Sequence, residues 1–229
     1  MGVEQTWDDG SPPSAGPDER SAPRPGYEVL SRLLDVAVAV AVLALLSPLW
    51  LAIAALIRTT SPGPALFRRT VAGRFGRPFT YYKFRTMVDG DDSHHRAWLR
   101  EFVVNDAAYQ HGTFKVVGDR RITGVGKVLR RLSLDEVPQM LNVLRGEMSL
   151  VGPRPPIMAE FELYDDRARR RLAVRPGITG LYQVTARSQV PFSRMVDIDL
   201  EYIRRRSLAL DVSIMLRTAV VMLAGRGAG

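Results

Sequence analysis

Cysteine is absent from this chain of 229 residues. A chain without cysteine forms no disulfide bond, offers no thiolate nucleophile and builds no zinc site on sulfur. A protein that works in the reducing cytoplasm fits this composition.

Large apolar residues are scarce in residues 1–26, which are instead rich in proline, glycine, serine and acidic residues. Such a segment buries too little apolar surface to offset the entropy of ordering. We therefore expect residues 1–26 to be a disordered tail without a catalytic role. No apolar stretch of the kind found in a signal peptide follows Met1.

A P-loop is missing as well. The run from Gly118 to Lys127 is rich in glycine and ends in Gly-Lys, but Arg121 stands where the pattern requires its first glycine. No serine or threonine follows Lys127 either. These departures exclude a P-loop nucleoside triphosphatase.

Basic residues outnumber acidic ones. The formal net charge is +8 and the isoelectric point is about 10.3. Anionic partners are expected for such a chain, which means phosphates, acidic lipid headgroups or nucleic acid. The length fits one domain with a sizeable core.

One long apolar run extends from Val36 to Ile57, with Ser47-Pro48 near its middle. As one straight helix it would be about 33 Å long, enough to span a bilayer of about 30 Å. Pro48 removes a backbone donor and predicts a kink, and the halves are only about 18 Å and 14 Å long. A re-entrant hairpin, a kinked spanning helix and a buried core helix remain open. In the hairpin, the Ser47 hydroxyl would satisfy a freed carbonyl.

Arginines flank this run and mark its orientation. Arg32 precedes it, Arg58 follows it, and Arg68, Arg69, Arg74 and Arg77 come next. The positive-inside rule therefore places the side that follows the run in the cytoplasm. We expect Asp35 to pair with Arg32 where the helix meets the interface.

The polar part of the chain begins with two short strands, predicted at Ala65–Phe67 and Phe79–Phe84, with a turn over Gly73–Pro78. Lys83 and Arg85 would share one face of the second strand because side chains alternate along a strand. An exposed edge guarded by charge is the simpler interpretation of these two cations.

The pair Asp135-Glu136 lies in the run Ser133-Leu-Asp-Glu-Val-Pro-Gln139, shortly after Arg130 and Arg131. A helix is predicted over Val137–Leu144, with Pro138 in its first turn and a stop at Arg145-Gly146, which puts Asp135 beside the N-cap. A plain helix cap is one interpretation. The other is a phosphate site, in which Arg130, Arg131 and Arg154 balance a diphosphate, one carboxylate attacks phosphorus and its neighbour holds Mg²⁺.

Four blocks of sequence together resemble the bacterial sugar transferases, the monotopic polyprenyl-phosphate phosphoglycosyl transferases. They are Lys83-Phe-Arg-Thr-Met87, Ser133-Leu-Asp-Glu-Val-Pro-Gln139, Asn142 to Pro155 and Arg175-Pro-Gly-Ile-Thr-Gly180. The resemblance runs from about Tyr27 to the C-terminus and is to the short form of the family. It favours a re-entrant hairpin, with its break at Ser47-Pro48, over the other two structures considered for the apolar run. Val137 departs from the commoner leucine, and Leu181-Tyr182 stands where an aromatic pattern varies.

The resemblance implies a reaction. Asp135 would attack the β-phosphorus of a UDP-sugar and release UMP, and polyprenyl (undecaprenyl) phosphate would then take the phosphosugar from the carboxylate. Glu136 would bind Mg²⁺. The same resemblance implies a role in binding phosphate or substrate for Lys83, Arg85, Arg130, Arg131, Arg154 and Arg175 and, by a weaker match, for Asp211. Such an enzyme would serve the first membrane step of exopolysaccharide, capsule, O-antigen or glycoprotein glycan assembly.

The expected fold is α/β of the α+β type, mainly helical with a small β-hairpin or sheet. A re-entrant helix hairpin over residues 27–60 would be followed by a cytoplasmic catalytic domain over residues 61–229, on the inner membrane of a bacterium.

Two helices are expected near the C-terminus. The first has an apolar face that is formed by Met195, Ile198, Tyr202 and Ile203. The last helix, Leu208–Leu223, has a narrow polar stripe and would lie among anionic lipid headgroups or in the core.

Two other classes of function compete with the enzyme. A membrane-tethered nucleic-acid binder is permitted by the charge, but the arginines cluster around carboxylates rather than stacking aromatics, so no nucleic-acid partner is expected. A non-catalytic membrane scaffold is disfavoured by the intact Asp135-Glu136 pair. A homodimer is left open.

Overall fold

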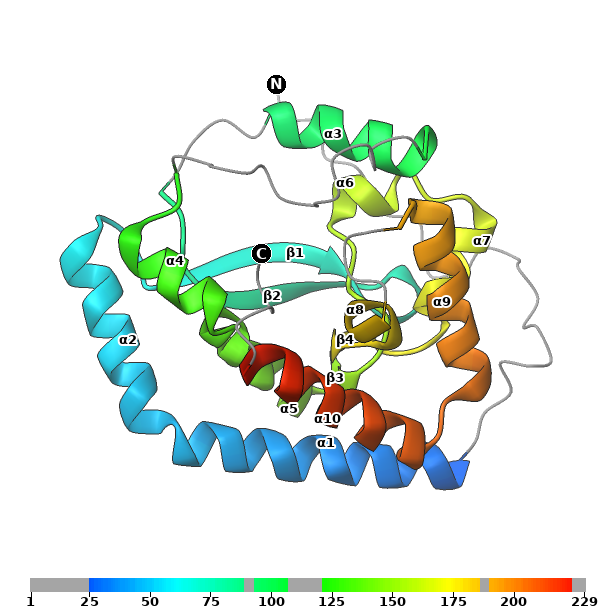
Figure 1. The fold of residues 1–229 in the computed structure, drawn as a ribbon, viewed down its shortest axis with the longest axis horizontal. Helices are drawn as coiled ribbons and strands as arrows, with labels where there is room; N and C mark the ends of the chain where they lie inside the picture. Colours follow the sequence, from blue (N-terminus) through cyan, green and yellow to red (C-terminus); the bar gives the residue numbers. More distant parts are fainter. Residues whose placement is uncertain (1–24, 89–92, 107–120, 186–189, 224–229) are drawn as a thin grey trace.

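The computed structural model of the protein describes residues 25–88, 93–106, 121–185 and 190–223. A long bent pair of helices frames a β-hairpin and a set of shorter helices (Figure 1). The architecture is mainly helical with little sheet, as expected for the α+β class. The predicted disordered tail falls almost wholly on residues 1–24, outside the described residues.

The bent pair consists of α1 (Pro25–Leu45) and α2 (Ser47–Thr60), which meet at an angle of 63°. Pro48 lies in the first turn of α2, where its missing N–H costs nothing. The Ser47 hydroxyl donates a hydrogen bond of 2.8 Å to the carbonyl of Ala44. The predicted break at Ser47-Pro48 and the predicted role of the Ser47 hydroxyl are therefore confirmed.

Among the described helices, none is by itself long and apolar enough to cross a bilayer, whereas α1 and α2 reach that length and composition together. α1 begins at Pro25, so the last two residues of the expected tail are helical instead. Proline is favoured in the first turn of a helix, which explains this boundary.

Two polar residues of α1 attach the bent pair to the rest of the chain. Asp35 is buried and accepts hydrogen bonds from the Ser149 hydroxyl and the Leu150 backbone N–H. Arg32 donates to the carbonyls of Val143 and Leu144. Asp35 and Arg32 still interact electrostatically, but no ion pair or hydrogen bond joins them, because each side chain binds partners that lie far away in the sequence.

The hairpin consists of β1 (Leu66–Ala72) and β2 (Pro78–Phe84), antiparallel, with Leu66 opposite Phe84 and Ala72 opposite Pro78. A short 3-10 turn, η2 (Arg74–Gly76), joins them. β1 is longer than the predicted Ala65–Phe67. The polar residues that follow Phe67 are typical of a loop, so the strand was predicted to end there. A strand face that is exposed to solvent accommodates such residues.

The helix predicted over Val137–Leu144 is divided in two. A 3-10 helix, η4 (Leu134–Gln139), contains the acidic pair, and α5 (Met140–Arg145) begins only after Pro138. Asp135 therefore lies in the first turn of η4 and does not cap α5. Proline disfavours the α-helical conformation in the residue before it, which explains the late start. The stop at Gly146, which has a φ of 78°, is as predicted.

A small parallel sheet joins two of the motifs. β3 (Ser149–Val151) pairs with β4 (Gly177–Thr179), and the chains come very close just beyond β3. A Cβ built on Gly177 would lie 2.1 Å from the backbone nitrogen of Gly152. Only glycine permits this approach, which sets the places of the Arg154 and Arg175 loops.

The remaining helices close the core. They are α3 (Ser93–Val104), α4 (Gly124–Arg131), α6 (Met158–Phe161), α7 (Asp166–Arg169), η5 (Arg170–Ala173), α8 (Leu181–Thr185), α9 (Phe192–Arg205) and α10 (Leu208–Leu223). The predicted inner face of α9 is buried, with Met195, Ile198, Tyr202 and Ile203 all at most 8% exposed.

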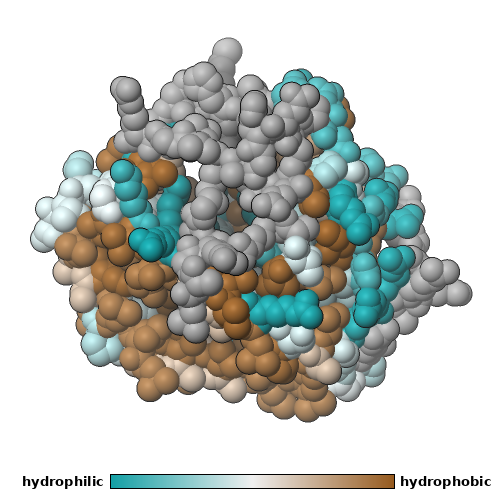
Figure 2. Space-filling view, viewed as in Figure 1, coloured by the Kyte–Doolittle hydropathy of each residue, from teal (hydrophilic) through white to brown (hydrophobic). Residues whose placement is uncertain are grey.

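Apolar side chains also remain on the outside. Figure 2 shows them gathered over the lower and left parts of the molecule, where α1, α2, α4 and α10 lie. The most exposed are Leu45 at the bend, Leu51 on α2, and Leu216 and Val220 on α10. A continuous apolar surface of this kind marks a site of contact with a membrane or another protein.

Candidate active site

The acidic pair lies where η4 packs against β2. Ser133, at the start of η4, has a left-handed backbone with a φ of 54°, and the chain turns there from α4 into η4. Asp135 is 8% exposed, while the Glu136 side chain is 34% exposed. The two neighbouring carboxylates therefore differ in their access to solvent.

Lys83 on β2 reaches Glu136. Its Nζ lies 2.7 Å from Glu136 Oε1, and the Lys83 side chain is 27% exposed. The same ammonium lies 5.3 Å from the centre of the Tyr81 ring, two residues earlier on the same strand face. Lys83, Tyr81 and the acidic pair thus form one cluster.

Burial and charge set the pKa values of this cluster. Burial raises the pKa of Asp135, Lys83 and Arg130 oppose the shift, and the Glu136 charge adds to it. Burial alone would lower the pKa of Lys83, but the attraction of Glu136, Tyr81 and Asp135 outweighs it, so that pKa is raised. Burial also raises the pKa of Tyr81 to about 12. At neutral pH Lys83 is a cation and Tyr81 a neutral hydroxyl.

Arg130 enters the cluster from α4. Thr123 caps this helix by accepting from the Gly126 backbone N–H, and a Cβ on Gly126 would lie 2.1 Å from the carbonyl of Thr86. This close approach lets Arg130 Nε donate to the Thr86 hydroxyl at 2.9 Å. Arg131 is exposed at the end of the same helix.

Arg154 is held by a chain of buried polar groups. Its Nη1 lies 3.4 Å from Glu160 Oε2, and Glu160 Oε1 accepts from the Tyr164 hydroxyl at 2.6 Å. Tyr164 in turn accepts from Arg171, whose Nε lies 2.7 Å from Asp199 Oδ2. We call Glu160, Tyr164, Arg171 and Asp199 the buried polar chain. Its charges fix the Arg154 guanidinium, which lies close enough to Tyr81 to lower the pKa of that hydroxyl.

Three of the residues implied by the family resemblance lie elsewhere. Arg85, which is buried, donates to the carbonyl of Ser61 at 2.8 Å and so fixes the end of α2, and it does not share the surroundings of Lys83. Asp211 accepts from Tyr27 and Tyr202 and joins α10 to α1. Arg175 lies beside Arg74 and Asp35. The structure thus brings together Lys83, Arg130, Asp135, Glu136 and Arg154 but leaves these three apart.

The donor set suits Mg²⁺ that is shared with a substrate. Among the described residues, no three carboxylates or histidines converge on one point. Mg²⁺ is commonly held by one or two carboxylates together with substrate phosphates and water. Glu136, the more exposed carboxylate of the pair, supplies a ligand, and Lys83, Arg130 and Arg154 attract phosphates, so the residues fit the metal.

Sequence reasoning missed Tyr81 and the buried polar chain. The position of Tyr81, two residues before Lys83, was a usable indication. The spacing of Glu160 and Tyr164, four residues apart, predicts contact only if both are helical, and α6 ends at Phe161.

The assembled groups can perform phosphoryl transfer. A buried carboxylate can act as a nucleophile toward phosphorus, and the nearby cations can balance the charge that develops on phosphate oxygens. The half-exposed Lys83–Glu136 pair can exchange partners when an anion arrives, whereas the buried polar chain cannot.

The chain is similar to known proteins over most of its length. The family described as Bacterial sugar transferase matches residues 26–225. The chain is 41% identical over 213 residues to the "Exopolysaccharide production protein ExoY" of Sinorhizobium fredii, which covers 92% of this chain and 93% of that protein.

Two further relatives have names that state a reaction. The "UDP-glucose:undecaprenyl-phosphate glucose-1-phosphate transferase" of Caulobacter vibrioides is 41% identical over 209 residues, covering 88% of this chain and 72% of that protein. The "Undecaprenyl-phosphate galactose phosphotransferase" of Salmonella typhimurium is 39% identical over 202 residues, covering 87% of this chain and 41% of that protein.

Proposed function

The chain belongs to the bacterial sugar transferase family, and on that premise we propose that it transfers a sugar 1-phosphate from a UDP-sugar to polyprenyl phosphate. It is an enzyme of the phosphoglycosyl transferase type, since relatives named for that reaction align with most of its length. The observation that carries the detailed proposal is the buried Asp135 beside Lys83, Arg130 and Glu136.

The first half of the reaction uses Asp135 as the nucleophile. Its carboxylate oxygen bonds to the β-phosphorus of the UDP-sugar, the bond from that phosphorus to the bridging oxygen breaks, and UMP leaves with the electron pair. Lys83 and Arg130, which oppose the rise in the Asp135 pKa, favour the ionised form of the attacking group. Arg154 binds phosphate oxygens as the charge shifts toward the leaving group.

The second half returns the enzyme to its starting state. A phosphate oxygen of polyprenyl phosphate attacks the same phosphorus, the acyl phosphate bond breaks, and polyprenyl diphosphosugar forms as Asp135 is released. Glu136 and the substrate phosphates would hold Mg²⁺, which would neutralise the negative charge of the phosphates when bound. The product serves the first membrane step of exopolysaccharide or related glycan assembly.

A two-stage assay tests this proposal. Full-length protein in lipid nanodiscs is mixed with Mg²⁺ and with UDP-glucose, UDP-galactose or UDP-N-acetylhexosamines. We expect about one UMP per enzyme without acceptor and continuous UMP release after undecaprenyl phosphate is added. A chain that releases no UMP from any of these donors would contradict the proposal.

Glu136→Gln tests the metal ligand. The amide oxygen is a weaker ligand than a carboxylate, so the Mg²⁺ concentration that gives half-maximal rate should rise by at least about tenfold. The control is Glu162→Gln, which removes the same charge from an exposed position just after α6. An unchanged Mg²⁺ titration for Glu136→Gln would assign the metal to other ligands.

The bent pair of α1 and α2 carries the proposed membrane attachment. Its bend, its exposed leucines and its combined length support a re-entrant hairpin that enters and leaves the inner membrane from the cytoplasmic face.

A labelling experiment tests this attachment. Because the chain has no cysteine, a single Ser14→Cys substitution gives a unique site for a membrane-impermeant thiol reagent. We expect labelling only after lysis, whereas in Pro48→Ala some chains should become labelled in intact cells. If the Ser14→Cys protein that retains Pro48 were labelled in intact cells, the bent pair would be a spanning helix.

A further inference from the structure

Three arginines converge on a hollow that the reaction does not use. The hollow has a volume of about 390 Å³ and lies between the turn of the hairpin and the end of α5. Arg74 and Arg77 line it from the hairpin turn, and Arg175 lines it from the loop before β4. We call it the arginine hollow.

The lining of the arginine hollow carries three cations and one carboxylate, Glu147, so its net charge is positive. Within the part of the chain that the structure describes, no hydrogen bond or ion pair holds the guanidinium of Arg175 or Arg77. Arg74 donates only through Nε, to the carbonyl of Ala173, and stacks at 4.8 Å on the ring of Phe75. The lining carboxylate of Glu147 accepts a hydrogen bond from Asn142 and, among the described residues, forms no ion pair with the three arginines.

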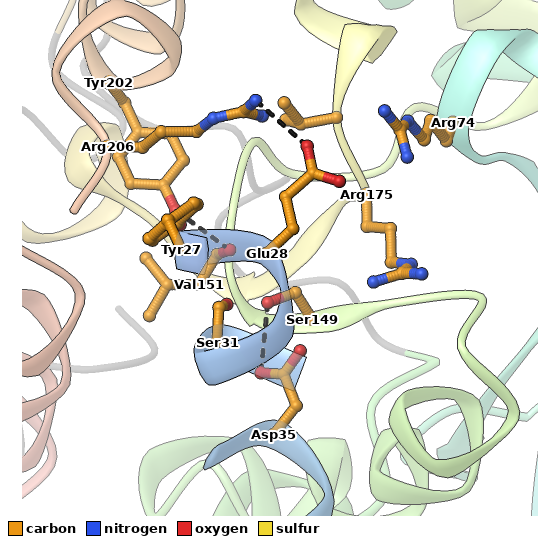
Figure 3. Close-up of a pocket in the computed structure, with 11 residues that line it drawn as sticks. Tyr27, Glu28, Ser31, Asp35, Arg74, Ser149, Val151, Arg175, Tyr202 and Arg206 are labelled. Atoms are coloured by element: carbon orange, nitrogen blue, oxygen red, sulfur yellow. Dashed lines mark hydrogen bonds and ion pairs between the residues drawn. The ribbon is translucent and has the colours of Figure 1, made fainter. Parts of the chain in front are cut away.

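A second, smaller hollow of about 50 Å³ shares Arg74 and Arg175 and extends to α1. Figure 3 shows these two arginines on one side of it and the ion pair of Glu28 and Arg206, 3.3 Å long, on the other. Burial lowers the pKa of Arg74, the charge of Glu28 opposes this shift, and Arg175 and Arg206 add to it because like charges repel. An anion that entered would relieve this repulsion.

The hollow is separate from the acidic pair. Phe79, which lines it, and Lys83, which pairs with Glu136, lie on one face of β2 and are about 13 Å apart at the usual rise per residue. Its lining includes none of Lys83, Asp135 or Arg154. A ligand there would leave the nucleophile free.

The surroundings indicate where the anion comes from. The smaller hollow is lined by the polar face of the first turns of α1, whose opposite face exposes Val29, Leu30 and Leu33. The turn of the hairpin exposes Phe75 beside the larger hollow. Apolar side chains that surround an arginine cluster place it at the level of lipid headgroups, where phosphate is the abundant anion.

We propose that the arginine hollow is a second binding site, for the phosphate group of an anionic membrane lipid. Arg77 and Arg175 donate charge-assisted hydrogen bonds to the phosphate oxygens, and Arg74, held by Ala173 and Phe75, adds a fixed positive charge. The site goes beyond the proposed sugar transfer, and its test does not measure turnover.

Native mass spectrometry of the full-length protein in a neutral detergent tests this site. Phosphatidylglycerol is titrated into the wild type, into Arg77→Gln/Arg175→Gln and into Arg58→Gln, a control that removes an exposed charge from α2. We expect the first phosphatidylglycerol to bind about tenfold more weakly, or worse, to the double variant than to the wild type and the control. Equal retention by all three would overturn the site.

Competition separates the sources of phosphate. Millimolar inorganic phosphate should displace the bound lipid only partly, and UMP should not displace it. Complete displacement at low inorganic phosphate would make soluble phosphate the ligand, and displacement by UMP would make the hollow part of the donor site. Either result would overturn the lipid proposal. Thermal unfolding of each variant verifies that the proteins compared are folded.

Discussion

The pairs Lys83–Glu136 and Arg171–Asp199 have the same nitrogen–oxygen distance of 2.7 Å and opposite surroundings. The side chains of the first are 27% and 34% exposed, and those of the second are 0% and 2% exposed. Water competes for the first pair and screens it, so its contribution to stability is small. The second is sealed in the core, where either charge alone would be very costly.

The difference in exposure distinguishes side chains that can contact the substrate from side chains that hold other residues in position. A half-exposed pair can open and accept a phosphate or a metal at low cost, which suits groups that meet a substrate. A sealed pair keeps one geometry and transmits it through Tyr164 and Glu160 to Arg154. Substitutions in the two regions should therefore have different consequences.

Among substitutions in the solvent-accessible region, Asp135→Asn should cause the largest loss of turnover. An amide cannot form the acyl phosphate, so turnover should fall by about a hundredfold or more while thermal unfolding changes little. UMP release without acceptor is the most direct measurement. A variant that still releases one UMP per enzyme would remove Asp135 from the role of nucleophile.

Asp199→Asn should have the largest effect on stability. It leaves Arg171 buried without its anion, so the free energy of unfolding should fall by about 3–5 kcal/mol. Arg205→Ala, which removes an exposed ion pair with Glu201, is the control and should cost below about 0.5 kcal/mol. Similar losses in thermal or denaturant unfolding would mean that burial does not distinguish the two pairs.

Lys83→Gln should change the pH dependence of turnover. Asp135 must be ionised to attack, its pKa is raised by burial, and the charge of Lys83 opposes that rise. Without this charge the pKa rises further, so the acid side of the kcat/KM profile should move to higher pH. Lys127→Gln, an equal change at an exposed position on α4, should leave the profile unchanged. Coincident profiles for Lys83→Gln and the wild type would contradict the charge contact.

Tyr164→Phe should have the smallest effect and tests the link between the regions. It removes one hydroxyl and disconnects Arg171 from Glu160, so Arg154 should lose its fixed position and KM for the UDP-sugar should rise by about threefold to tenfold. Tyr202→Phe removes another buried hydroxyl, which is bonded to Asp211, and should reduce stability without that change in KM. A rise in KM for both variants would indicate general loosening.

Local sequence patterns were enough to predict several elements. The break at Ser47-Pro48, the stop at Gly146 and the buried face of α9 follow from proline, glycine and apolar spacing, which act within a few residues. The start of α5 was placed too early because Pro138 permits two solutions, a first helical turn or a preceding 3-10 turn. The packing of η4 against β2 selects the second.

The candidate site was predicted less completely. The acidic pair and its cations came from motifs, but the partners of Asp35 and Arg85 lie far away in the sequence and no local pattern indicates them. The buried polar chain is harder still, because glutamate, arginine and aspartate are usually exposed and only the tertiary fold brings these four together.

Asp35 and Arg32 bind α1 to β3 and to the end of α5, so a displacement of α1 would be transmitted to the catalytic unit. If α1 and α2 lie in a bilayer as proposed, tilting of the helices alone would not match a bilayer that is thicker or thinner than their apolar length. Hydrophobic mismatch would instead raise or lower the acidic pair relative to the plane in which polyprenyl phosphate diffuses. The acyl-chain length of the host membrane would thereby become a determinant of acceptor access, with no change in any residue of the site.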